Sequence, residues 1–106
     1  MKRKARTEEE FAITSLWTLS TGHMTQEDST VLSQQEELVV YEYDEGFWVI
    51  VPDICDVGDD YWDRLRAYGV SGALCHIISV AIGKSVSIVR FDADGPTYDF
   101  LPLYNW

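Results

Sequence analysis

The feature that most constrains the fold is a pair of apolar stretches separated by three turn-forming residues. Residues 38–43 and 47–51 are rich in β-branched and aromatic side chains, which favour strands, and Asp44-Glu45-Gly46 lies between them. A short turn can reverse the chain where glycine adopts a positive φ. The sequence therefore predicts a β-hairpin in which Gly46 supplies the positive φ and Pro52 ends the second strand.

Further strands and helices are expected on both sides of this hairpin. Leu74, Ile77, Ile78, Ala81 and Ile82 recur at the three- and four-residue spacing of a buried helix face. We expect strands at residues 11–19 and 85–91, a short helix at residues 26–34 capped by Thr25, a helix that starts after Asp59 or Asp60 and stops at Gly69, and a helix capped by Ser71 that ends at Gly83. The order β-α-β-β-α-β, with the second helical segment in two pieces, predicts an α+β fold of ferredoxin-like type, an antiparallel sheet with helices on one face.

The size and composition indicate one folded domain. The chain has 106 residues, of which 46% are hydrophobic and 13% aromatic, too apolar for a disordered chain. Residues 1–10 lack apolar periodicity and are expected to form a flexible arm, followed by a single domain at residues 11–106. No apolar run approaches the roughly 20 residues that cross a bilayer, and no apolar signal-peptide core follows the basic start. We therefore expect a cytoplasmic protein.

The charge of the chain is strongly acidic and unevenly distributed. Asp and Glu number 18 against eight Lys and Arg, and four of the basic residues lie within the first six positions. Such a surface repels nucleic-acid phosphates and anionic membranes and attracts basic protein surfaces, including those that normally hold nucleic acid. The charge therefore predicts a protein partner without direct nucleic-acid or membrane contact. The alternative is that the charge only keeps the protein soluble.

Acidic residues concentrate in two neighbouring parts of the sequence, the hairpin and the loop and helix that follow it. If they form one negative face, their carboxylates imitate DNA phosphates, and aromatic residues among them anchor an interface. The alternative is a solvated acidic face with the aromatic side chains in the core. The predicted partner-binding residues are Glu42, Asp44, Glu45, Asp53, Asp56, Asp59, Asp60, Asp63, Tyr61 and Trp62.

The sequence offers no convincing catalytic or metal site. Phe91-Asp92-Ala93-Asp94-Gly95 resembles the nucleophile motif of haloacid-dehalogenase-type phosphatases, but that motif belongs on the first strand of a much longer domain. A strand-to-loop turn is the simpler interpretation, although cation binding by Asp92 and Asp94 stays open. The two cysteines and two histidines lack the spacing of zinc ligands. We expect no enzyme, no cofactor and no metal.

Several segments are similar to a family of small uncharacterised proteins carried on plasmids, prophages and genomic islands, often beside toxin and antitoxin genes. The similarity rests on residues 20–28 (STGHMTQED), 68–71 (YGVS), 91–94 (FDAD) and 101–106 (LPLYNW). No activity or catalytic residue comes with this resemblance. It implies a habitat on mobile DNA, where small acidic proteins commonly disarm host defences.

Charge and habitat together predict an inhibitor of anti-CRISPR or antirestriction type. Its partner would be the basic surface of a CRISPR effector or restriction enzyme. A rival hypothesis is a toxin–antitoxin-associated regulator that binds a toxin or a second copy of itself as a homodimer. A magnesium-dependent phosphatase acting through Asp92 and Asp94 is the third. Finally, residues 96–106 are apolar enough to predict that they pack on the sheet or at a dimer contact.

Overall fold

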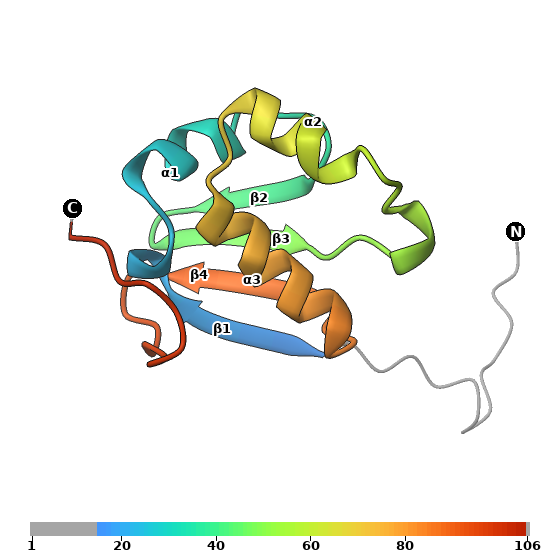
Figure 1. Ribbon diagram of the computed structural model, residues 1–106. Coiled ribbons are helices and arrows are strands. Elements are labelled where there is room, and N and C mark those ends of the chain that lie inside the picture. The colour runs from blue at the N-terminus through green and yellow to red at the C-terminus, as the bar shows by residue number, and fades with distance from the viewer. Residues whose placement is uncertain (1–14, 106) are drawn as a thin grey trace, which may run out of the picture.

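The computed structural model describes residues 15–105 (Figure 1). The expected arm at residues 1–10, and residues 11–14 of the first expected strand, lie outside the described residues. The elements are β1 (Leu16–Ser20), η2 (Thr21–His23), α1 (Gln26–Leu32), β2 (Val39–Tyr43), β3 (Gly46–Ile50), η3 (Ile54–Asp56), α2 (Tyr61–Tyr68), α3 (Gly72–Gly83) and β4 (Ile88–Asp92).

The predicted α+β class and the β-α-β-β-α-β order of elements are confirmed, with α2 and α3 as the two pieces of the second helical segment. The four strands form one sheet in the order β1-β4-β3-β2. The pairs β2–β3 and β3–β4 are antiparallel, as expected, whereas β1 and β4 pair in parallel. Parallel neighbours need a long connection, and here the whole hairpin and three helices separate the two strands in the chain.

The hairpin has the predicted strands but a shorter turn. Tyr43 pairs with Gly46, so only Asp44 and Glu45 form the turn and Gly46 is the first residue of β3. The expectation that Gly46 supplies a positive φ is wrong, because among the described glycines only Gly69 has one. Glycine is needed at position 46 for space: a Cβ there would lie 1.7 Å from the backbone oxygen of Phe91 on the neighbouring strand.

Gly46→Ala is therefore expected to lower the free energy of unfolding by about 1–3 kcal/mol, the usual cost of overpacking. The obstacle is backbone, so β3 and β4 must move apart to admit the methyl group. Urea denaturation measures the change, and Gly58→Ala is the matched control, since the nearest atom to its added Cβ is the Asp60 side chain at 3.7 Å. Equal stability of the two variants would contradict the close approach of β3 and β4.

The predicted helix ends are largely confirmed. The side chains of Thr25 and Ser71 cap α1 and α3, and Gly69 ends α2 with a φ of 106°. Asp60 precedes α2 as expected, but its side chain does not cap the helix. That carboxylate instead accepts from Arg64, with 2.6 Å between the atoms. β4 begins three residues later than predicted, after a turn at residues 84–85.

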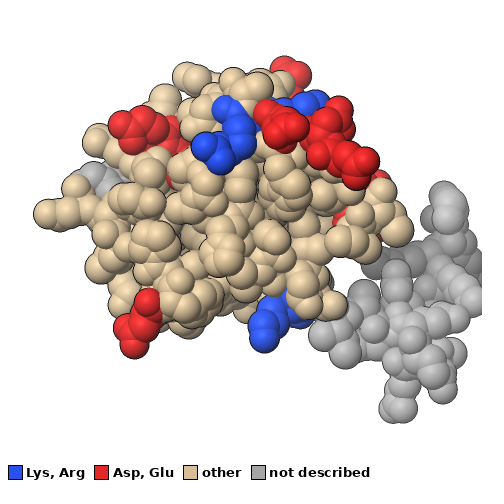
Figure 2. Space-filling model, viewed as in Figure 1, with Lys and Arg blue, Asp and Glu red and all other residues tan. Residues whose placement is uncertain are grey.

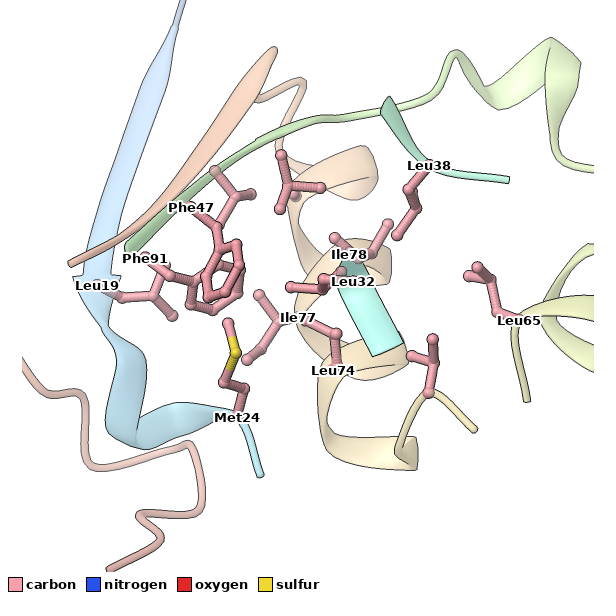
Figure 3. Close-up of a cluster of buried hydrophobic side chains, with 14 of the residues drawn as sticks. Leu19, Met24, Leu32, Leu38, Phe47, Leu65, Leu74, Ile77, Ile78 and Phe91 are labelled. Atoms are coloured by element: carbon pink, nitrogen blue, oxygen red, sulfur yellow. The ribbon is translucent and has the colours of Figure 1, made fainter. Parts of the chain in front are cut away.

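The three α-helices pack on the same face of the sheet, and the core lies between them (Figure 1). Figure 3 shows Phe47 and Phe91 projecting from the sheet toward Met24 and Ile77. Leu32, Leu65 and Leu74 bring α1, α2 and α3 into the same cluster. In β3 and β4 every second residue is buried against the helices, and in β1 Leu19 is buried while Trp17 is partly buried against the core. The residues between them point to the opposite face.

Candidate functional site

His23 is fully buried and holds the closing segment of the chain against η2. The backbone N–H of Tyr98 donates to Nε2 at 2.9 Å, and Nδ1 lies 2.6 Å from the carbonyl oxygen of Pro102. Since Nε2 accepts, the ring carries its proton on Nδ1 and donates it to Pro102. Leu101 is buried in the same segment, so residues 96–105 contact the domain, although Phe100 and Leu103 are 59% and 63% exposed.

Asp28 is also fully buried and joins the first turns of α1 and α3. Its carboxylate accepts from the N–H of Thr25 at 3.1 Å, from the N–H of Ser71 at 2.7 Å and from the hydroxyl of Ser71 at 2.5 Å. The hydroxyls of Thr25 and Ser71 in turn cap the two helices. One carboxylate thus ties two helix N-termini together, which is a structural role.

Asp92 organises the turn that follows β4. It accepts from the N–H of Asp94 at 2.8 Å and from the Tyr43 hydroxyl at 2.7 Å, and the Tyr43 bond lowers the pKa of Asp92. The motif therefore forms the strand-to-loop turn named above as the simpler interpretation. Within residues 15–105, no three His, Cys, Asp or Glu side chains gather as a metal site would require.

Burial, followed by the hydrogen bond to Asp92, raises the pKa of Tyr43 from 10.0 to about 12. The native state thus holds this proton more tightly than the unfolded chain does. Its contribution to stability is complete below pH 10 and is lost as the pH rises toward about 12. We expect the tyrosine carbon resonances to show this high titration and Asp92→Asn to move it toward 10.0. An unmoved titration in that variant would argue against the Tyr43–Asp92 bond.

The predicted acidic residues separate into two groups at opposite ends of β3. The first, at the hairpin turn, consists of Glu42, Asp44 and Glu45, all exposed. The second follows β3 through η3 into α2, and we call it the acidic end. Figure 2 shows acidic side chains gathered at the upper right, where Figure 1 places α2. The acidic end consists of the exposed residues Asp53, Asp56, Asp59, Asp60 and Asp63.

The two predicted aromatic anchors lie differently from one another. Tyr61 is 3% exposed and belongs to the core, which fits the alternative that these rings are structural. Trp62 is half-buried and packs edge-on against Tyr61, with 5.3 Å between the ring centres. The exposed apolar side chain beside the acidic end is instead Ile54, at 66% exposure.

The sheet carries a second candidate surface that sequence reasoning missed. Within residues 15–105 no helix covers the face of the sheet opposite the core, which we call the open sheet face. The signal for it is the alternation along each strand, since the residues between the core positions must share this face. In the observed register they form three cross-strand rows: Leu16, Ile88, Ile50 and Val39; Thr18, Arg90, Trp48 and Tyr41; and Ser20, Asp92, Gly46 and Tyr43.

The fold and these surfaces define a class, that of a small α+β domain. The side chains of His23, Asp28 and Asp92 stabilise its own packing and turns, and the acidic end and the open sheet face are its two distinctive surfaces. The chain belongs to a family of unknown function, DUF5983, whose C-terminal domain matches residues 16–106. No curated protein and no solved structure matches the chain.

The resemblance segments have structural explanations in this fold. His23, Thr25 and Asp28 anchor the closing segment and the helix caps, Ser71 completes the Asp28 network, and Asp92 shapes a turn. Each of these residues thus has a structural role, and of the five Asp92 also lies on the open sheet face. The acidic end and the open sheet face are the candidate functional surfaces. None of the helices described at residues 15–105 has the length and apolar character to span a membrane.

Proposed function

We propose that this protein binds the basic surface of another protein and thereby blocks a nucleic-acid-binding site of a host defence system, of anti-CRISPR or antirestriction type. The observation that carries the proposal is the acidic end. Five carboxylates lie there within 11 residues of chain, all exposed. Closely spaced carboxylates present a negative surface to a site that normally holds phosphates.

The acidic end keeps most of its charge available for a partner. Within residues 15–105 only Asp60 of this group is ion-paired, with Arg64, which also binds Glu37 at 2.9 Å. Ile54, which follows Asp53 in the chain, is exposed beside the acidic end and offers an apolar contact there. Charge would guide the encounter and the apolar side chain would support the contact.

The habitat implied by the resemblance supports the same function. The family to which the chain is similar occurs on plasmids, prophages and genomic islands, and an inhibitor of CRISPR or restriction systems protects such DNA. The proposal therefore places the protein in the cytoplasm of a bacterial host, where those systems act.

The test is affinity capture from a bacterial host that carries CRISPR and restriction systems, read by mass spectrometry at low and moderate salt. Because the acidic groups lie at opposite ends of β3, two variants can remove three charges each from different places. Asp53→Asn/Asp56→Asn/Asp59→Asn is expected to reduce recovery of the defence complex about tenfold or more. Glu42→Gln/Asp44→Asn/Glu45→Gln, with the same net charge, should retain it.

Two outcomes would contradict the proposed function. Recovery of a toxin alone would favour the regulator hypothesis, and equal losses in the two triple variants would mean that net charge, and not the acidic end, drives binding. A circular dichroism melt of each variant confirms that it is folded.

The open sheet face specifically favours the second candidate function, a self-associating binding module.

A further inference from the structure

The open sheet face presents apolar and aromatic side chains to solvent over all four strands. Tyr41 is 61% exposed, Val39 54% and Leu16 45%, while Trp48 and Ile88 between them are half-buried. The register places Val39 and Leu16 at opposite ends of one row, so the apolar surface crosses the whole sheet. A contiguous apolar face of this kind is typical of an interaction surface.

Arg90 lies near the centre of this face. Its guanidinium carbon is 5.5 Å from the centre of the Trp48 ring, and its buried Nε has no hydrogen-bond partner within residues 15–105. Asp92 lies two residues further along β4 and points to the same side. The face therefore carries one cation and one anion side by side, and within its three rows these are the only charged residues.

The charge of this face indicates what covers it. The molecule has a net charge of −10, yet the open sheet face is neutral, because Arg90 and Asp92 balance each other and Glu42 of β2 is on the opposite side of the sheet. A neutral apolar face suits a partner face that is also neutral and apolar, and it does not suit a phosphate chain. Arginine, tryptophan and tyrosine are also the residues that most often dominate binding energy at protein interfaces.

We propose that the open sheet face binds the same face of a second copy of this chain, forming a two-fold homodimer. In a two-fold contact the same surface serves both copies, so each Arg90 can meet the Asp92 of the other copy. The hydrogen bond that Tyr43 donates to Asp92 favours the negatively charged form of Asp92. The two sheets then pack face to face with Tyr41, Trp48 and the Val39 row between them.

Sedimentation equilibrium of the isolated protein tests the dimer. The double variant Val39→Ser/Tyr41→Ser, which changes two exposed side chains, is expected to raise the dimer dissociation constant by at least about tenfold. Ile54→Ser removes an apolar side chain of similar exposure outside the face and should leave the dimer intact. High salt should strengthen the dimer, because it screens repulsion between the acidic molecules and favours apolar burial.

A monomeric wild-type protein at all protein and salt concentrations would overturn the proposal. So would a dimer that the folded Val39→Ser/Tyr41→Ser variant retains. Binding of a labelled single-stranded DNA or RNA to this face would also overturn it, since aromatic and arginine side chains on a sheet can stack bases. Because the experiment uses the protein alone, its result is independent of the partner sought at the acidic end.

Discussion

Replacing Asp28 with alanine is expected to lower the free energy of unfolding by about 3–4 kcal/mol. The substitution removes the carboxylate that joins α1 to α3 and leaves the N–H of Thr25 and the N–H and hydroxyl of Ser71 without their acceptor. Leaving a buried donor unpaired costs about 1–3 kcal/mol, and partial entry of water reduces the sum. Urea denaturation followed by circular dichroism measures the change.

Glu27→Ala is the control for Asp28→Ala, because Glu27 lies in the same first turn of α1 but is exposed. It is expected to change the free energy of unfolding by less than about 0.5 kcal/mol. Similar effects of the two substitutions would mean that Asp28 contributes only through its charge near the helix N-terminus. The network to Ser71 would then have no energetic importance.

His23→Ala is the second substitution with a large expected effect, about 3 kcal/mol of unfolding free energy. It removes the two hydrogen bonds that the His23 ring makes to the closing segment, at Tyr98 and Pro102, and opens a cavity in a fully buried position. Beyond the loss of stability, we expect faster hydrogen exchange at the Tyr104 amide, which donates to Gly22 beside His23.

His76→Ala is the matched control, because His76 is exposed on α3. It should leave both the stability and the Tyr104 exchange rate nearly unchanged. If His23→Ala lowered stability without changing exchange at Tyr104, His23 would act as a core side chain and not as the anchor of the closing segment.

Local sequence signals predicted the elements of this fold well. The β-branched and aromatic residues on both sides of Asp44 and Glu45 predicted both hairpin strands, and Thr25, Gly69 and Ser71 marked helix ends because capping depends on a few adjacent residues. Signals that depend on distant contacts were absent. Glycine is required at position 46 because the Phe91 backbone on β4 leaves no room for a Cβ. The local sequence pattern instead predicted a turn residue with a positive φ.

The sites were harder to predict because they depend on how distant segments meet. The acidic residues are close in sequence, but the length of β3 separates the hairpin group from the acidic end, at about 3.3 Å per residue. His23 and its partners are 75 and 79 residues apart, so no local pattern shows their contact. The open sheet face was accessible to sequence reasoning in principle, since Val39, Tyr41 and Arg90 alternate with core residues.

The most direct test of the proposed function measures whether the protein displaces nucleic acid from its partner. A defence complex recovered by capture is bound to a fluorescent oligonucleotide that it recognises, and anisotropy is followed as the protein is added. The wild-type protein and Glu42→Gln/Asp44→Asn/Glu45→Gln are expected to release the oligonucleotide. Asp53→Asn/Asp56→Asn/Asp59→Asn should need at least about tenfold more protein. An oligonucleotide that stays bound at saturating wild-type protein would contradict the account.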